Sequence, residues 1–179
     1  MAMPKQQGGL VLQEQPCPLT DKDILMIQES WMEVYKNHAA NGQVILLRFF
    51  EEFPNAKKFF SNFKDMKQSD LERSKSLIAH GIRVMNFLND VITNFDDTEH
   101  VATKLRDLGK SHAVQHNVEH IYFENLSNVI LAVLKEAFSE VVTSEVADAW
   151  TKLFNNLCIA VKRVYEDLGW IKLLESPSK

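Results

Sequence analysis

The chain is short of the residues that mark several common kinds of protein. Its 179 residues include only two cysteines, Cys17 and Cys158, and these form neither a CxxC pair nor a zinc-type spacing. A disulfide-stapled secreted fold is therefore not expected, and a reducing cytoplasm is the predicted location. Six glycines and five prolines, most of the prolines lying near the ends, favour long uninterrupted helices over many tight turns.

Long apolar runs and an excess of basic charge are also missing. No apolar stretch approaches 18 residues, so no membrane partner is expected. The first residues lack the basic-then-apolar layout of a secretion signal, and Ala2 excludes N-myristoylation. Lys and Arg number 20 against 24 Asp and Glu, a net charge of −4, so no nucleic-acid partner is expected either.

What the sequence does have is helical periodicity over most of its length. Thr20-Asp21-Lys22-Asp23 resembles a capping box, and apolar residues recur at helical spacing behind it. Asn41-Gly42 is expected to end this first helix, and Pro54 the second. Further helices are predicted over about 69–92, after Asp97, and over 118–139 and 144–168, with Gly169 as a stop. The prediction is one all-α domain over residues 20–170, with flexible extensions at 1–19 and 171–179.

Two histidines lie on the apolar faces of separate predicted helices. His80 shares a stripe with Leu77 and Val84, and His112 shares one with Leu108. A single histidine on such a face is more often a core or rim residue than a metal ligand. Two of them in an all-helical domain of this size can approach a haem iron from both sides, which favours haem over a catalytic triad.

The surroundings of these histidines fit the same hypothesis. The carbonyl of Leu108 or the hydroxyl of Ser111 can accept the second ring N–H of His112 and fix its tautomer. Gly42 and Gly81 each cost a helix about 1 kcal/mol relative to alanine, which suggests a close helix crossing, although Gly42 can equally mark a turn. Four apolar side chains can pack against or above a porphyrin: Leu46, Phe60, Phe63 and Val84.

Three other kinds of site have weaker support. His112, His116 and His120 have a spacing that can bind zinc, but no carboxylate completes an HExxH motif. The acidic stretch at 96–99 lacks EF-hand spacing and is better explained as a helix cap. No nucleophile elbow supports Ser-His-Asp hydrolysis.

The segments FFEEFPNAKKFFSNF, LIAHGIRV and LGKSHAVQHNVEHIYF together resemble the globin family, over about residues 19–170. The resemblance implies a globin fold of about eight helices enclosing one haem b. It also implies that His112 is the proximal iron ligand and His80 the distal histidine, with Arg83 and His116 near the haem propionates. The remaining cofactor-binding residues that it implies are Leu46, Phe60, Phe63, Val84, Leu108, Val118 and Phe123.

Within the globins the chain is most similar to vertebrate cytoglobins, as in IYFENLSNVILAVLKEAF, while FDDTEHVATKLRDL resembles jawless-vertebrate haemoglobins. The cytoglobin likeness implies a distal histidine that binds iron itself when no gas is present. Two cysteines of that subfamily correspond here to His38 and Ile82, so their disulfide is not expected. Cys17 with Cys158 is an unpromising substitute.

The resulting expectation is a haem protein, monomeric or homodimeric, that reversibly binds O2, CO and NO at Fe(II). The subfamily resemblance also implies oxidation of NO to nitrate, supported by a cellular reductant or reductase, so the question of enzyme activity stays open. Two alternatives remain: a dedicated oxygen transport or storage globin with a pentacoordinate site, and a haem-free interaction module with the same fold.

Overall fold

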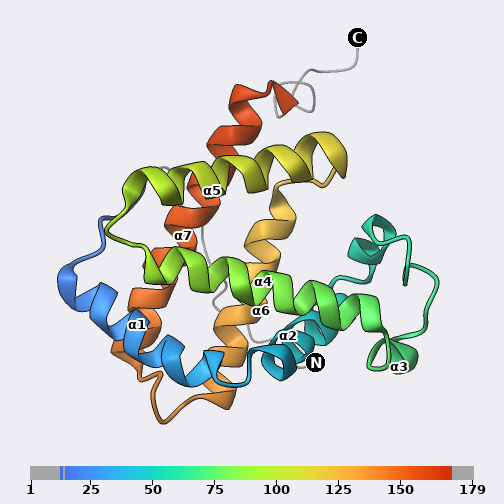
Figure 1. Cartoon of the computed structure of the whole chain (residues 1–179), viewed down its shortest axis with the longest axis horizontal. Helices are drawn as coiled ribbons and strands as arrows, with labels where there is room; N and C mark the ends of the chain where they lie inside the picture. Colours follow the sequence, from blue (N-terminus) through green and yellow to red (C-terminus); the bar gives the residue numbers. More distant parts are fainter. Residues whose placement is uncertain (1–12, 14, 171–179) are drawn as a thin grey trace, which may run out of the picture.

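The computed structural model describes residue 13 and residues 15–170 (Figure 1), and within them the chain is all-helical, as predicted. Because the π-helical turn η2 directly continues α5, the elements of this region make eight helical segments. No helix in the described region is long and apolar enough to cross a membrane. The elements are α1 (Asp21–Tyr35), α2 (His38–Glu52), the 3-10 helix η1 (Pro54–Phe59), α3 (Gln68–Leu71), α4 (Lys75–Thr93), α5 (Thr98–Lys110), η2 (Ser111–Gln115), α6 (Ile121–Ala137) and α7 (Ser144–Asp167).

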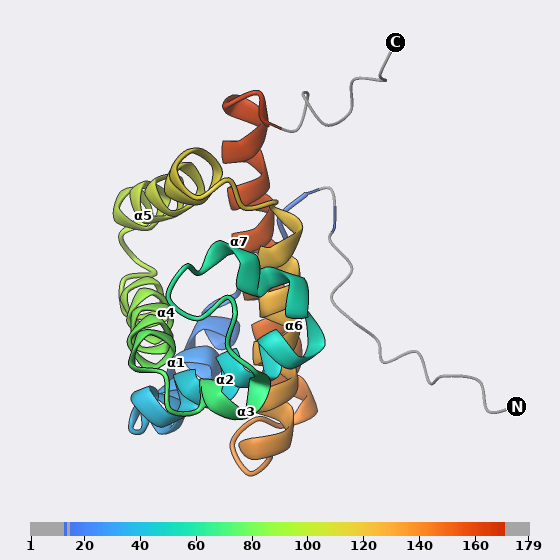
Figure 2. The same ribbon diagram turned by 90° about the vertical axis from the view of Figure 1, so that its right-hand side faces the viewer.

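The long helices are arranged in two layers. Figure 2 shows α4 and α5 on one side of the molecule and α6 and α7 on the other. The layers are joined because α5 packs against α7 and α2 packs against both α4 and α6. The first helix, α1, closes one end by packing against α7, α4 and α2.

Several predicted helix ends are confirmed. Thr20 forms a capping box, in which its hydroxyl accepts from the backbone N–H of Asp23 and the Asp23 carboxylate accepts from the backbone N–H of Thr20, both at 3.0 Å. Pro54 is the first residue of η1. Gly169 follows α7 with a φ of +72°, a left-handed conformation that favours glycine and ends the helix.

Two other predicted boundaries are wrong. The break after the first helix lies at residues 36–37, and Asn41-Gly42 lies inside α2. The Asn41 side chain donates to the carbonyl of Val34 at 2.7 Å, so it bridges the helix junction instead of ending a helix. The helix predicted over 69–92 is two helices, because Ser74 starts α4 by accepting from the backbone N–H of Leu77.

The close helix crossing inferred from the two glycines is confirmed. Gly42 on α2 and Gly81 on α4 meet backbone to backbone. A Cβ atom added at Gly42 would lie 2.7 Å from the Gly81 carbonyl oxygen, and one added at Gly81 would lie 2.9 Å from the carbonyl carbon of Gly42. This contact fixes the position of α4, and therefore of His80, the residue before Gly81.

The segment before α1 pairs with α7. The side-chain amide of Asn156 donates to the Cys17 carbonyl at 2.7 Å and accepts from the Cys17 N–H at 2.9 Å. The neighbouring Asn155 accepts from the backbone N–H of Gln13 at 3.0 Å. The part of the expected 1–19 extension that the structure describes is thus bound to the helical body, while 1–12, 14 and the 171–179 extension lie outside the described residues.

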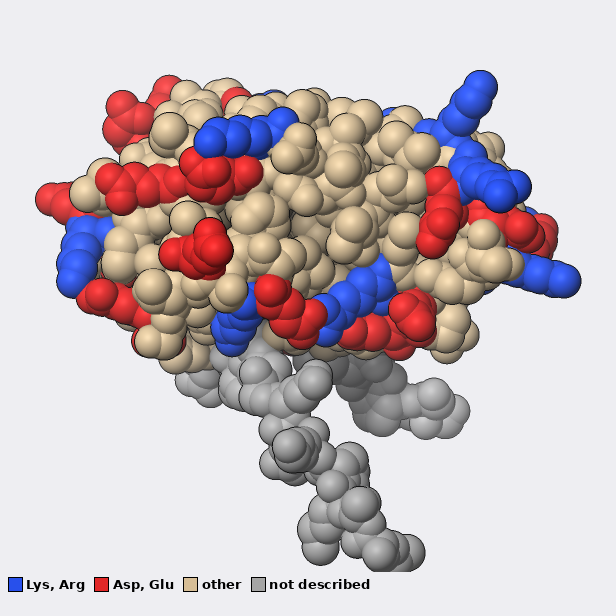
Figure 3. Space-filling view, turned by 90° about the horizontal axis from the view of Figure 1, so that it is seen from below, with Lys and Arg blue, Asp and Glu red and all other residues tan. Residues whose placement is uncertain are grey.

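Burial separates an aromatic core from a surface of mixed charge. Trp31 of α1 and Trp150 of α7 are both buried, with ring centroids 5.9 Å apart, and the Trp150 indole donates to the hydroxyl of Ser30 at 2.9 Å. On the face shown in Figure 3, basic and acidic side chains lie close to one another around an uncharged central area. Interspersed charges of this kind are typical of a solvated surface.

Candidate functional site

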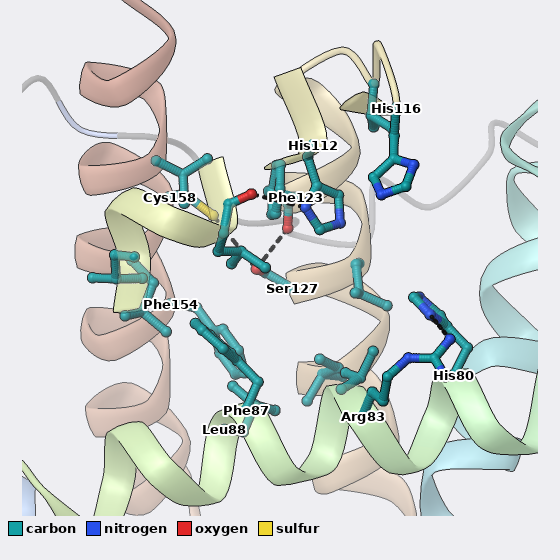
Figure 4. Close-up of a pocket in the computed structure, with 18 of the residues that line it drawn as sticks. His80, Arg83, Phe87, Leu88, His112, His116, Phe123, Ser127, Phe154 and Cys158 are labelled. Carbon is teal, nitrogen blue, oxygen red and sulfur yellow. Dashed lines mark hydrogen bonds between the residues drawn. The ribbon is translucent and has the colours of Figure 1, made fainter. Parts of the chain in front are cut away.

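A large cavity of about 520 Å³ lies between the α4–α5 layer and the α6–α7 layer (Figure 4). Its volume falls within the range of sites for small molecules and cofactors, about 300–1,000 Å³. The walls are mostly apolar, and the polar groups are few. The lining residues are Phe59, Phe60, His80, Arg83, Val84, Phe87, Leu88, Leu105, Leu108, His112, His116, Val118, Phe123, Leu126, Ser127, Ile130, Phe154, Leu157, Cys158 and Val161.

His112 enters the cavity from η2, two residues after the end of α5. Its Nδ1 lies 2.8 Å from the carbonyl oxygen of Leu108, and because a carbonyl can only accept, Nδ1 carries the proton. Burial lowers the pKa of His112, so the ring is neutral and its Nε2 keeps a free lone pair. The ring also packs edge-on against Phe123, with centroids 5.1 Å apart. His112 is therefore oriented and protonated as a metal ligand should be.

The turn that carries His112 is wider than an α-helical turn. The N–H of His116 bonds to the carbonyl of Ser111, five residues back, at 3.3 Å. Asn117 then adopts a φ of 52°, a left-handed conformation that asparagine tolerates better than most residues. The reversal brings the Val118 N–H to within 2.9 Å of the His112 carbonyl and places Val118 in the cavity wall.

His80 enters the same cavity from α4, on the opposite side from His112 (Figure 4). Its ring packs edge-on against Phe60, with centroids 4.9 Å apart. Burial, and then the positive charge of Arg83, lower the pKa of His80 to about 4, so this ring is neutral as well. Nη2 of Arg83 lies 3.3 Å from Nδ1 of His80.

The structure brings together most of the residues predicted for the site. Leu46 and Phe63 are the exceptions, because both are buried in the core cluster and neither lines the cavity. Phe63 stacks behind Phe60, with ring centroids 4.8 Å apart, and so supports the cavity wall from the far side. The predicted residues that line the cavity are Phe60, His80, Arg83, Val84, Leu108, His112, His116, Val118 and Phe123.

Apart from Phe123, sequence reasoning missed the part of the wall formed by α6 and α7. Ser127 and Cys158 are the polar pair there: the Ser127 hydroxyl donates to the Phe123 carbonyl at 2.7 Å and lies 3.4 Å from the Cys158 sulfur. Burial raises the pKa of the Cys158 thiol to about 11, which keeps it protonated. Cys17 and Cys158 are both free thiols, so the Cys17–Cys158 disulfide considered from the sequence does not form.

The alternative zinc site at His112, His116 and His120 gains no support. Among the described residues, no three His, Cys, Asp or Glu side chains gather closely enough to hold a metal ion. A spacing of four residues places histidines on one face only in a continuous α-helix. Here the helix passes through a π-turn and ends before His120.

A metalloporphyrin fits the chemistry of this cavity. The two neutral imidazoles on opposite sides of the cavity could hold a porphyrin iron between them, and aromatic and aliphatic side chains would provide a dry apolar wall. The His112 Nδ1–H bond to Leu108 is the outer hydrogen bond that metal-bound histidines almost always make.

Comparison with known proteins identifies the family. The sequence pattern of the Globin family matches residues 43–161. Cytoglobin-1 of Oryzias latipes is 45% identical over 177 residues, 98% of this chain and 100% of that protein. Cytoglobin-2 of Danio rerio is 43% identical over 91% of this chain and 92% of its own length. Globin-2 of Mordacia mordax is 34% identical over 83% of this chain and 93% of its own length. The chain therefore belongs to the globin family, which implies a haem cofactor and O2 as a ligand.

Proposed function

We propose that the chain holds haem b between His112 and His80 and reversibly binds O2, CO and NO at Fe(II), with His112 as the proximal ligand. The observation that carries the proposal is the pair of neutral imidazoles facing one apolar cavity from opposite sides. Haem iron supplies the gas-binding chemistry, and the protein supplies its ligands and surroundings.

His112 has two tasks in this proposal. Its Nε2 lone pair would bind the iron, and its Nδ1–H bond to the Leu108 carbonyl holds the ring in one orientation. The same bond increases the electron density on Nε2 and strengthens the ligand. Phe123, packed edge-on against the ring, limits its rotation.

His80 acts on the other side of the iron. When it donates its ring N–H, it stabilises a gas ligand that carries partial negative charge. If His80 bound the iron itself, a gas would have to displace it. The apparent affinity for the gas then falls in proportion to the fraction of molecules with an open site.

The remaining cavity residues exclude water and fix the cofactor. Phe60, Val84, Leu108 and Val118 supply apolar contact with the porphyrin faces. His116 is the group that we expect at a propionate, since it borders the cavity beside His112, with ring centroids 5.9 Å apart. Leu46 and Phe63 lie in the core cluster behind this wall.

We further infer that the protein works in the cytoplasm, as a monomer or homodimer, with a cellular reductant. The two free thiols support a reducing compartment. Oxidation of NO by O2 to nitrate takes one electron from Fe(II), so repeated turnover requires a reductant or reductase. The second candidate is a dedicated oxygen carrier or store with a pentacoordinate site, which the contact between Arg83 and His80 favours.

The test is the visible spectrum of the dithionite-reduced protein without added gas, in the wild type and three variants. Split, sharp bands indicate that His80 binds the iron, and one broad band indicates a pentacoordinate site. His112→Ala should lose most of its haem, whereas His80→Leu should keep haem and, where His80 binds iron, take up CO faster. His100→Ala is the matched control, because His100 pairs with Asp90 away from the cavity. Full haem content and an unchanged spectrum in His112→Ala would refute the proximal assignment.

A further inference from the structure

The two cavity histidines differ in the groups that their Nδ1 atoms meet. Nδ1 of His112 faces a carbonyl oxygen, that of Leu108, at 2.8 Å. Nδ1 of His80 faces Nη2 of Arg83, one turn further along α4, at 3.3 Å (Figure 4). A carbonyl only accepts hydrogen bonds, and a guanidinium only donates them. The two rings are therefore held by opposite partners.

These partners select opposite tautomers. The Leu108 carbonyl requires a proton on Nδ1 of His112 and leaves Nε2 with a lone pair. The Arg83 guanidinium requires a lone pair on Nδ1 of His80, so a neutral His80 ring carries its proton on Nε2. Within one pocket, His112 is thus prepared as a metal ligand and His80 as a hydrogen-bond donor.

We propose that Arg83 holds His80 in the tautomer with the proton on Nε2, and so opposes ligation of the haem iron by His80 while favouring donation to a bound gas. A neutral imidazole binds a metal through the nitrogen that carries no proton. For His80 to bind iron through Nε2, its proton must move to Nδ1, where it would face an N–H of Arg83. Ligation therefore requires Arg83 to move away.

Arg83 is in this account a positioning residue that sets the ratio of hexacoordinate to pentacoordinate iron. The inference rests on the proposed haem site but adds a control that the site itself does not require. It also assigns Arg83 a role different from the propionate contact expected from the family resemblance. The edge-on packing of Phe60 against His80 keeps the ring in place while the guanidinium acts on one of its nitrogens.

Three substitutions at position 83 separate donor chemistry from charge and bulk. Arg83→Lys keeps a positive group that only donates, Arg83→Met removes the donor, and Arg83→Glu offers only acceptors to Nδ1. In the reduced, gas-free protein, the ratio of hexacoordinate to pentacoordinate iron should be close to the wild-type ratio in Arg83→Lys. It should be about tenfold higher in Arg83→Met and higher again in Arg83→Glu. A tenfold change in this ratio corresponds to about 1.4 kcal/mol. We expect a value at the low end of the range for a hydrogen bond to a charged group because Arg83 is exposed. Arg73→Glu, a charge reversal at another exposed arginine, is the matched control and should leave the ratio unchanged.

The tautomer itself is measured in the diamagnetic CO complex by long-range ¹⁵N–¹H NMR of the histidine rings. His80 should carry its proton on Nε2 in the wild type and Arg83→Lys, and on Nδ1 in Arg83→Glu. Normal haem and CO binding with the same ratio and the same His80 tautomer in all position-83 variants would overturn this inference alone. A wild-type protein that takes up no haem would overturn the proposed function and this inference with it.

Discussion

Replacing Gly81 by alanine tests whether the backbone contact between α2 and α4 positions the distal side of the pocket. The new Cβ would lie 2.9 Å from the carbonyl carbon of Gly42, 3.0 Å from its oxygen and 3.2 Å from the backbone nitrogen of Gln43. All three are backbone atoms, so no side chain can rotate to make room. The two helices must separate instead.

The magnitude follows from two opposing effects. Non-bonded carbon atoms prefer a separation of about 3.5–4.0 Å, and forcing one extra methyl group into a tight contact costs about 1–3 kcal/mol. Alanine recovers about 1 kcal/mol of helix propensity. The net loss in unfolding free energy is therefore about 1 kcal/mol, or a fall of about 3 °C in Tm for a domain of this size. Because His80 precedes Gly81, the shift of α4 should also change the rate of CO binding.

The assay is guanidinium unfolding of the CO-saturated protein, followed by circular dichroism, together with the CO-binding rate. Gly109→Ala is the matched control, since its Cβ would meet the Val164 side chain at 3.0 Å and not the backbone of another helix. It should lose less stability than Gly81→Ala. A Gly81→Ala protein that is more stable than the wild type, by the propensity gain alone, would refute the argument from the helix crossing.

Three further outcomes are expected. With iodoacetamide in the folded protein, Cys158 should react far more slowly than Cys17, because it is buried with a pKa raised to about 11; equal rates would contradict its placement. Thr20→Ala should lower the unfolding free energy by about 1 kcal/mol through loss of the α1 cap, measured by denaturant titration, with no change in haem content. The backbone N–H of Thr20 and then Lys152 lower the pKa of the Asp23 carboxyl. The Asp23 carboxylate therefore stabilises the fold above its unfolded pKa of about 3.9, and this stabilisation is lost as pH falls through the lower, folded pKa. Asp23→Asn should therefore lose less stability than the wild type between pH 5 and 2, and parallel acid-unfolding curves would argue against the contribution.

The helix bodies could be predicted because their signals are local. Apolar spacing, the Thr20 capping box, Pro54 and Gly169 each act within one or two turns. Asn41-Gly42 was interpreted wrongly because both residues commonly end helices, whereas here their contacts are made with Val34 and Gly81. Such contacts between helices are invisible to a local pattern.

The site was predictable from the same motifs only in part. His80, His112 and their near neighbours stand out because histidine is unusual on an apolar stripe. Ser127 and Cys158 line the cavity from α6 and α7, where a cavity-facing position has the same helical spacing as a core-facing one. The Leu108 carbonyl is one of the two His112 partners expected from the sequence. The contact between Arg83 and Nδ1 of His80 depends on side-chain placement, so the opposite tautomers of the two rings could not be derived from spacing.

The pairing of Asn156 with residue 17 has a consequence for how the segment before α1 can change. The asparagine amide donates to the carbonyl and accepts from the N–H of the same residue, as the backbone of a neighbouring strand would. These two hydrogen bonds involve only main-chain atoms of residue 17 and not its side chain. Pro16 and Pro18 restrict the chain on either side toward extended conformations. The sequence at position 17 is consequently free to drift to almost any residue except proline, which has no N–H to donate, while the segment keeps the same path across α7.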